Sequence, residues 1–395
     1  MTTLAELLNR FDAEKILLLE IDPDGAAPIY ISDTPYFTEP GDAVPNQPYY
    51  PVVKFNGVPR LTRKIQEVFG GRSVPSWGPL DIATPIVGGV DLSIANIRGK
   101  TIRAKLTGPR SQIALADAAV IMEGVVGVRS GNVDEGVTIE VIDRQEQFNY
   151  IRFPTSFYDG TESATFPASN IGKPKPLCLG TCRNITPVLI DAANLVYQVN
   201  DGAINDILDV YDSGVALTKV GGVPAAGQYS INTANATFTL GGSTSGQPTA
   251  DVEGIMDGAT WLTSTTQIID WLARTYGGVT AGDIDISGLP GDAVGYYIND
   301  IATLADVITA LMKGVLGWWG FNRANTLVAR LMDSPAAGGN VFGDLLQLSD
   351  ITWREAPDLY WSIPVRYGRN WSHIQQPAGA VSLDRVAWLA GDGYE

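Results

Sequence analysis

The two cysteines of the chain, Cys178 and Cys182, lie four residues apart in "GKPKPLCLGTCRNITPVLID", residues 172–191. Thiols bind soft metals and form redox disulfides, so this pair is the first candidate for chemistry. The surrounding prolines argue against a helix, and in an extended strand the two residues would lie roughly 13 Å apart. That separation is too large for a disulfide or for two ligands of one metal ion. We therefore interpret both as small buried hydrophobic side chains, with a metal site shared between chains on an oligomer axis as the alternative.

Other residues with catalytic potential are few. The single histidine, His373, lies in "NWSHIQQ", where nothing indicates a Ser-His-Asp or Cys-His system. The pairs Asp22/Asp24 and Asp283/Asp285 have the residue types for Ca²⁺ binding or for glycosidase carboxylates, but each lies near Gly or Pro, where Asp commonly forms turns. The tryptophans and tyrosines are expected in cores or subunit interfaces rather than in a sugar groove. The sequence predicts no catalytic, cofactor-binding or metal-binding residues, and no enzyme.

Composition and charge narrow the classes of function. The 395 residues include 43 acidic and 27 basic side chains, a net charge of −16, and such a surface repels nucleic acid and anionic membranes. No run of about 18 apolar residues could span a bilayer, and the N-terminus does not resemble a signal peptide. Two cysteines do not form a disulfide framework, so we expect synthesis in a reducing cytoplasm.

The N-terminal part reads as strands joined by turns. Residues 15–33 contain two apolar runs around a Pro-Asp-Gly turn and predict a hairpin. The proline-rich stretch 34–53 is expected to be an ordered loop. Between residues 61 and 148 several segments alternate apolar and polar residues, most clearly at 137–143. We predict an antiparallel β-rich domain over residues 1–155.

The rest of the chain divides into a connector and two further regions. Residues 156–252 are predicted to form a connector and a β-meander, and residues 253–395 an α+β module. In the module, an amphipathic helix follows Thr263 or Ser264, and a second one is predicted over 303–316. The second helix should pack on a strand pair at 318–331, and "PDLYWSIPVRYGRNWS" should form a last strand. The helix residues facing that sheet would be Leu304, Val307, Ile308 and Leu311, opposite Trp319 or Phe321 and Leu327. The predicted fold class is α+β, predominantly antiparallel β, with several domains.

The order of these segments resembles the tail-tip proteins of long-tailed bacteriophages. The matching motifs are "TPYFTEPGD…YYPVV", "GVDLSIANIRGKTIRAKLTGP", "GVTIEVIDR", the connector "GKPKPLCLGTCRNITPVLID" and "YQVNDGAINDILDVYDSGVAL". The C-terminal half is similar to the baseplate-hub module of that group, with "GWWGFNRANTLVARL" and "IPVRYGRNWS". The likeness covers most of the chain, and the connector is its most specific part. In this view the connector is a rigid link, in which Gly180 allows a bulge or a close approach.

The resemblance implies a structural subunit of a phage tail tip. A baseplate hub protein would form a ring that joins the tail tube to the receptor-binding tip and gates the DNA channel, as a trimer or, alternatively, a hexamer. Its partners would be other tail proteins: the distal tail or tube, the tape measure and the tip fibre. DNA would pass without being held, so channel surfaces should be acidic rather than lined by arginines such as Arg60, Arg63 and Arg103.

Two alternatives remain open from the sequence. The chain could be a distal-tail ring protein of the same tail tip, or a virion adhesin or carbohydrate-active protein. The final "AWLAGDGYE" has no Gly or Pro stop and no polar tail, so further domains or partner chains are expected to follow it.

Overall fold

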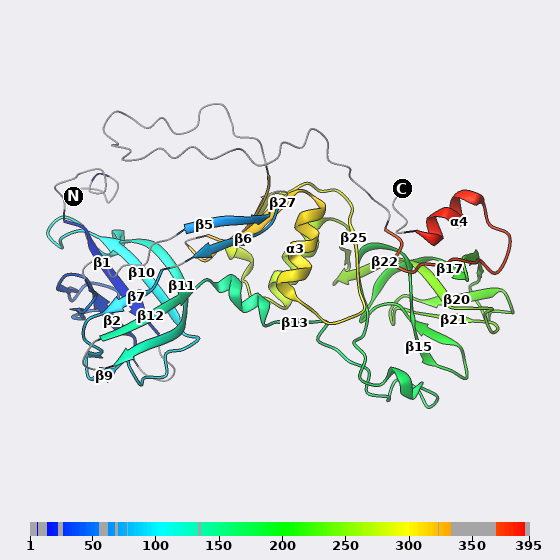
Figure 1. Cartoon of the computed structure of the whole chain (residues 1–395), viewed down its shortest axis with the longest axis horizontal. Helices are drawn as coiled ribbons and strands as arrows, with labels where there is room; N and C mark the ends of the chain where they lie inside the picture. The colour runs from blue at the N-terminus through cyan, green and yellow to red at the C-terminus, as the bar shows by residue number, and fades with distance from the viewer. Residues whose placement is uncertain are drawn as a thin grey trace, which may run out of the picture. The chain divides into compact units, whose positions relative to one another are not determined.

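The structure is a computed structural model that describes residues 6, 14–22, 27–54, 62–67, 70–76, 78–132, 136–322, 324–332 and 369–391. It divides into two compact units (Figure 1). Unit 1 comprises Met1–Arg152, Ile269–Leu289 and Thr303–Leu331, and unit 2 comprises Phe153–Ile268, Pro290–Ala302 and Met332–Glu395. The sequence predicted three consecutive domains, whereas each unit contains segments from distant parts of the chain. The sheets are mostly antiparallel with few helices, which confirms the predicted fold class.

The larger sheet of unit 1 has eight strands in the order β3-β4-β2-β1-β10-β11-β12-β7. The predicted hairpin is confirmed, because β1 pairs antiparallel with β2. The proline-rich stretch is ordered but is not only a loop, since it contains the short strands β3 and β4. The strand bounds are β1 Ile16–Ile21, β2 Ile29–Ser32, β3 Tyr36–Phe37, β4 Pro48–Pro51, β7 Leu80–Ile82, β10 Thr101–Thr107, β11 Ala119–Asn132 and β12 Gly136–Ile142; the short strands β8 Ile86–Val87 and β9 Val90–Asp91 pair separately.

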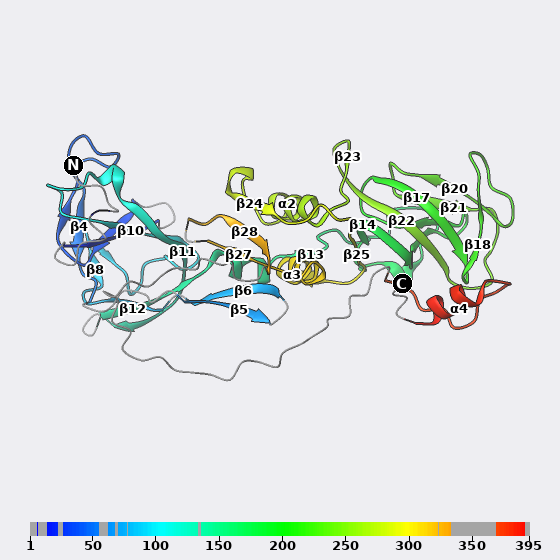
Figure 2. The ribbon, with the colours of Figure 1, turned by 90° about the horizontal axis from the view of Figure 1, so that it is seen from above.

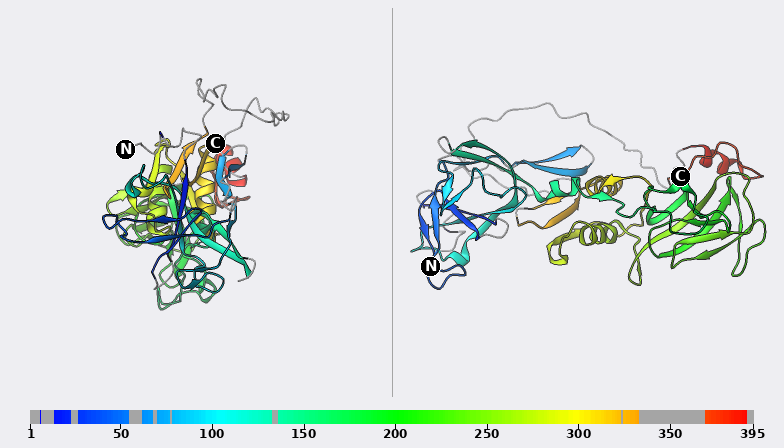
Figure 3. Two further views of the ribbon diagram at one scale, coloured as in Figure 1. Left: turned by 90° about the vertical axis from the view of Figure 1, so that its left-hand side faces the viewer. Right: turned by 90° about the horizontal axis from the view of Figure 1, so that it is seen from below.

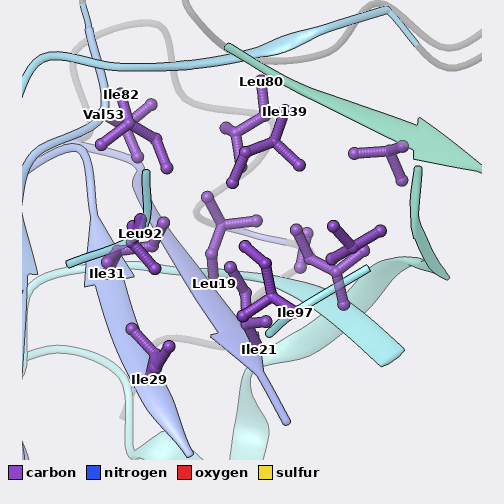
Figure 4. Close-up of a cluster of buried hydrophobic side chains, with 14 of the residues drawn as sticks. Leu19, Ile21, Ile29, Ile31, Val53, Leu80, Ile82, Leu92, Ile97 and Ile139 are labelled. Carbon is purple, nitrogen blue, oxygen red and sulfur yellow. The ribbon is translucent and has the colours of Figure 1, made fainter. Parts of the chain in front are cut away.

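The core of this sheet follows from the alternation of its strands. In β12 the side chains of Val137, Ile139 and Val141 are buried, as the alternate spacing predicts. They join Leu19 and Ile21 of β1 in one hydrophobic cluster (Figure 4). Complete burial of such aliphatic side chains is worth about 1.5–3 kcal/mol each and anchors unit 1.

A second sheet of unit 1 has five strands in the order β24-β28-β27-β6-β5. The predicted strand pair is confirmed as β27 (Gly317–Phe321) and β28 (Leu327–Leu331), which are antiparallel. The strand β6 (Gly70–Ser76) pairs with β5 (Thr62–Glu67) and, in parallel, with β27. The strand β24 (Ile284–Gly288) pairs in parallel with β28. This sheet therefore joins residues far apart in the sequence.

Helix α3 (Leu304–Gly314) packs against β27 and β6 (Figure 2). Thr303 caps it, and Asp306 completes a capping box, as predicted. The predicted apolar face is buried, and the Nε1 of Trp319 donates to the Thr309 hydroxyl at 3.0 Å. The predicted packing of the helix on the strand pair is therefore confirmed. Helix α2 (Thr265–Thr275) begins after Ser264, whose hydroxyl accepts from the backbone N–H of Gln267 at 3.3 Å.

Unit 2 consists of two sheets around one hydrophobic cluster (Figure 3). One sheet runs β18-β17-β22-β14-β25 with β23 on β22, and the other runs β15-β16-β21-β20-β19. The bounds are β14 Leu177–Ile185, β15 Val188–Asp191, β16 Val196–Gln198, β17 Ile204–Asp212, β18 Val215–Ala216, β19 Thr218–Lys219, β20 Gln228–Asn232, β21 Thr237–Leu240, β22 Pro248–Asp257, β23 Thr260–Trp261 and β25 Gly295–Ile298. Helix α4 spans Leu383–Ala390, and the short strands β13 and β26 span Arg152–Phe153 and Ala302–Thr303. None of the helices described is long and apolar enough to cross a membrane.

Candidate functional site

Both cysteines lie in β14, between β22 and β25, and both are fully buried. The Sγ of Cys178 donates to the Val199 carbonyl at 3.3 Å, and the Sγ of Cys182 to the Leu179 carbonyl at 3.7 Å. The interpretation of two small buried side chains is confirmed. Across the residues that the structure describes, no group of three or more His, Cys, Asp or Glu side chains could hold a metal ion. The segment predicted as a link is in fact a central strand of unit 2.

The strand β14 that contains both thiols is not regular. Gly180 has a φ of +72°, and the strand changes partner there, from β25 on its N-terminal side to β22 on its C-terminal side. Burial, together with the Cys182 side chain, raises the pKa of the Cys178 thiol well above its ordinary value. A neutral, buried thiol is a poor nucleophile, so the pair is structural in character.

Gly180 also makes the close approach that the sequence suggested. A Cβ atom at this position would lie 1.7 Å from the carbonyl oxygen of Val294. A glycine is therefore required on two grounds: the left-handed backbone conformation and the contact with a neighbouring main chain.

Next to the cysteines, Asp251 of β22 is buried with only 2% of its side chain exposed. Its carboxylate accepts from the backbone N–H of Asn184 at 2.7 Å, the Tyr211 hydroxyl at 3.1 Å and an Arg183 guanidinium nitrogen at 3.2 Å. Burial and, to a smaller extent, the negative charge of Asp251 raise the pKa of the Tyr211 hydroxyl. Three donors compensate the desolvation of one carboxylate, so this network ties β14, β17 and β22 together.

Residues 369–391, called the C-terminal strap from this point, belong to unit 2. Asn370 joins the strap to the rest of the unit. Asn370 forms a parallel β-bridge with Arg183, and its side-chain carbonyl oxygen accepts from the Asn184 side chain at 2.7 Å. Its amide nitrogen donates to the carbonyls of Trp388 and Leu389 near the end of α4. Of the predicted last strand only residues 369–372 are described, and the rest lies outside the described residues. His373 is an exposed residue of the strap.

A pocket of about 650 Å³ opens in unit 2 where the segments 170–176, 186–189, 244–248 and 297–300 meet Tyr197 of β16. Five of the lining residues are buried: Pro176, Pro187, Tyr197, Pro248 and Tyr297. The polar residues of the lining include Asn170, Lys173, Thr244, Gln247, Asn299 and Asp300. The sequence did not predict this site, because its lining residues come from five separate segments.

The walls of the pocket are braced against each other. The Tyr297 hydroxyl donates to the Thr186 carbonyl at 2.7 Å and joins β25 to the connection between β14 and β15. The Asn170 amide donates to the Leu189 carbonyl at 3.0 Å, and the Lys173 ammonium donates to the Asn170 side chain at 2.8 Å. These bonds join the segments that line the pocket.

In unit 1, the five-stranded sheet has β5 and β24 as its edge strands. Neither strand pairs with another strand on its outer side within the described ranges. An unpaired edge is a template for another strand, so these two edges are the candidate assembly surfaces of unit 1.

Charged side chains also gather on the eight-stranded sheet of unit 1. The Glu20 carboxylate accepts from the Lys105 ammonium at 2.6 Å and the Tyr49 hydroxyl at 2.7 Å. Arg103 pairs with Glu123 at 3.0 Å and approaches Glu20 at 3.7 Å. Arg103 is therefore neutralised by carboxylates. Arg63 belongs to β5, and Arg60 lies outside the described residues.

Asp283 and Asp285, the acidic pair that the structure describes in full, do not belong to a group of residues that could hold a metal ion. Asp285 pairs with Arg330, whose hydrogen bond lowers the pKa of that carboxyl group. Asp283 accepts from the Thr280 hydroxyl, as expected of a turn residue. Asp22 follows β1, and Asp24 lies outside the described residues.

Comparison with known proteins gives little further information. No protein family matches this sequence, and no curated protein is significantly similar to it. One solved structure with a detectable likeness is a chain from the "Virion of native gene transfer agent (GTA) particle". The two are 11% identical, and the alignment covers 65% of this chain and 85% of that chain with a TM-score of 0.26. A TM-score this low does not establish a shared fold, so no conclusion rests on it.

Proposed function

We propose that this chain is a structural, non-enzymatic subunit of a bacteriophage tail tip, a baseplate hub protein that forms a ring. The observation that carries this proposal is the five-stranded sheet of unit 1, whose edge strands β5 and β24 have no outer partner in the described structure. Natural proteins protect such edges, and pairing between subunits of a closed ring is one way to do so.

The direction of the strands is compatible with such a ring. From β24 through β28, β27 and β6 to β5, the pairings are parallel, antiparallel, parallel and antiparallel. The two edge strands therefore run in the same direction, and β5 of one copy can pair in parallel with β24 of the next. This contact uses two different surfaces of each subunit, and head-to-tail contacts of this kind generate rings when the rotation closes.

The sequence resemblance to tail-tip proteins supplies the position of the ring. We propose a trimer, with a hexamer as the alternative, between the tail tube and the receptor-binding tip of the virion. Its partners would be the distal-tail or tube, tape-measure and tip-fibre proteins, and the chain would be made in the host cytoplasm. The ring would gate the DNA channel, and the pairing of Arg103 with Glu123 and Glu20 agrees with a surface that does not hold DNA.

Native mass spectrometry and labelled electron microscopy test this proposal together. The purified chain should form a closed oligomer whose mass is three or six times 42.2 kDa, and a label on the chain should appear at the tail tip of virions. A label on the capsid or along the tail shaft would contradict the proposed position.

A substitution at the edge tests the proposed contact. Ser287 is an exposed residue of β24, and Ser287→Lys places a charge where a neighbouring strand would pair. We expect a folded monomer with an unchanged melting temperature. Ser130→Lys is the matched control, because Ser130 is exposed but lies in β11 of the other sheet. Equal oligomerisation of the two variants would exclude β24 as the interface.

A further inference from the structure

We propose that the pocket of unit 2 binds a neutral saccharide and does not cleave it. This inference does not depend on ring assembly, because every residue that lines the pocket belongs to unit 2 of a single chain.

The size and stiffness of the pocket suit a small ligand. Its volume of about 650 Å³ lies within the roughly 300–1,000 Å³ that is usual for ligand sites. Four prolines line it, and each fixes its own backbone φ. Together with the bond from the Tyr297 hydroxyl to Thr186, they make a preformed cavity, which reduces the entropy lost on binding.

The charge of the pocket points to a neutral ligand. Its lining carries one cation, Lys173, and one anion, Asp300, in a chain with a net charge of −16. The Lys173 ammonium already donates to Asn170, so no cluster of cations is available for an anion. One carboxylate is also too few for a metal ion, which usually takes several oxygen ligands.

The arrangement of polar and apolar groups matches a sugar. A pyranose has an apolar C–H face and a ring of hydroxyl groups, each of which donates and accepts hydrogen bonds. The four prolines of the lining give it apolar surface, whereas Tyr197 and Tyr297 are only 8% and 4% exposed and pack against Phe238 and Trp371. The lining also contains the side-chain amides of Asn299 and Gln247, and an amide supplies a donor and an acceptor side by side for neighbouring hydroxyls.

A peptide ligand is disfavoured because the edge strand at the wall is already occupied. Extended peptides commonly bind by adding a strand to a sheet edge. On β15 the Leu189 carbonyl accepts from the Asn170 side chain at 3.0 Å, and the Ile190 carbonyl accepts from the Ser163 hydroxyl at 2.6 Å. These carbonyls are therefore not available to an added strand.

Cleavage is not expected, because glycoside hydrolysis commonly uses two carboxylates on either side of the bond. Among the described residues that line the pocket, Asp300 alone carries a carboxylate. The site is thus suited to holding a saccharide rather than to hydrolysing it.

Calorimetry on the purified full chain tests the proposal. The probes are neutral tetrasaccharides of glucose, galactose, mannose, rhamnose and N-acetylglucosamine, with sialylated and sulfated glycans as anionic comparators. We expect at least one neutral probe to bind with a dissociation constant of about 1 mM or lower, and no product to form on long incubation. The double variant Asn299→Ala/Gln247→Ala should weaken that binding at least about fivefold, because it removes two hydrogen-bonding side chains.

The control is Asn235→Ala, which removes an exposed amide of unit 2 that does not line the pocket. It should bind as the wild type does, and circular dichroism should show that all variants are folded. The proposal is overturned if no neutral probe binds, if the anionic glycans bind more tightly, or if the double variant binds as tightly as the wild type. Hydrolysis of a probe would also overturn it. So would binding of a proline-rich peptide that neutral saccharides do not displace. Saccharide binding can be measured on the folded protein whatever its oligomeric state. A negative binding result therefore contradicts this proposal without contradicting the proposed ring.

Discussion

Units 1 and 2 are both built mainly from antiparallel strands, but the contacts at the edge strands of their sheets differ. In unit 2 side chains of Asn170 and Ser163 bond the carbonyls of the edge strand β15, and Asn370 of the C-terminal strap bridges to Arg183 of the inner strand β14. In unit 1 the five-stranded sheet ends at β5 and β24 without an outer partner among the residues described. The same type of sheet is therefore self-contained where other segments fill its edge, and is open to assembly where they do not.

The units also differ in whether their packing requires an unusual backbone conformation. Unit 1 relies on regular alternation, as in β12, and on a capped helix over a strand pair. Unit 2 depends on an irregularity in its central strand at Gly180. Substitutions that disturb one of these features and spare the other sharpen the comparison.

The largest effect is expected for Gly180→Ala in unit 2. The new Cβ would meet the Val294 carbonyl oxygen at 1.7 Å, and the φ of +72° disfavours any side chain. We expect a loss of more than about 4 kcal/mol of stability, because neighbouring main chains must move apart. Hydrogen exchange should show lost protection in β14, while α3 of unit 1 keeps its own.

Gly227→Ala is the matched control, because Gly227 has a similar φ of +80° but no atom within 4 Å of the position that a methyl group would take. Gly227→Ala should lower the free energy of unfolding by only the cost of placing a side chain in a left-handed backbone conformation, about 1–2 kcal/mol. Equal losses for the two variants would show that the contact with Val294 is unimportant.

Leu311→Ala should destabilise unit 1 by about 2–5 kcal/mol, because it leaves a cavity between α3 and the sheet. Leu311 is only 2% exposed. Chemical denaturation measures the loss, and hydrogen exchange should place it in α3 and β27. Leu383→Ala provides the comparison, since Leu383 is 86% exposed in α4 and should change stability by less than about 0.5 kcal/mol. An unchanged stability for Leu311→Ala would contradict the packing of α3 on the sheet.

A smaller effect is expected for the double substitution Cys178→Ser/Cys182→Ser. Both side chains already face carbonyl acceptors, Val199 and Leu179, so the hydroxyls have partners. The loss per residue should therefore stay below the roughly 1–3 kcal/mol that a buried hydroxyl without a partner costs. The raised pKa of Cys178 also predicts that a thiol reagent reacts only after denaturant is added. Stoichiometric zinc or iron in the wild type, absent from the double variant, would refute the structural role.

The smallest effect concerns Asp191, at the end of β15. Hydrogen bonds from the Thr165 hydroxyl and then from Asn194 lower the pKa of this carboxyl group to about 2. Because the folded value is depressed, its stabilising contribution is complete above the ordinary value near 3.8 and is lost as the pH falls through about 2. Thr165→Ala should raise the pKa toward 3.8, as measured by carboxyl NMR titration. Thr165→Ser keeps the hydroxyl and should leave the pKa unchanged; a shift of similar size in both variants would rule out this cause.

Local signals in the sequence determined several elements correctly. The Pro-Asp-Gly turn indicated the hairpin of β1 and β2, and the alternation at 137–143 indicated β12. Thr303 and Asp306 indicated the start of α3, because a capping box involves residues only three positions apart. Such features depend on neighbours in the chain, so they are visible without the fold.

Only the tertiary structure decided how these elements combine. The parallel pairing of β27 with β6 joins segments about 250 residues apart, and the pocket of unit 2 draws on five separate segments. The change of partner along β14 occurs at Gly180, whose positive φ the residue type permits but does not require. Pairing partners and backbone choices at glycine are set by contacts with distant residues. For that reason the sequence alone determined which elements form, whereas the fold decided which edges close, which stay open and where a ligand can enter.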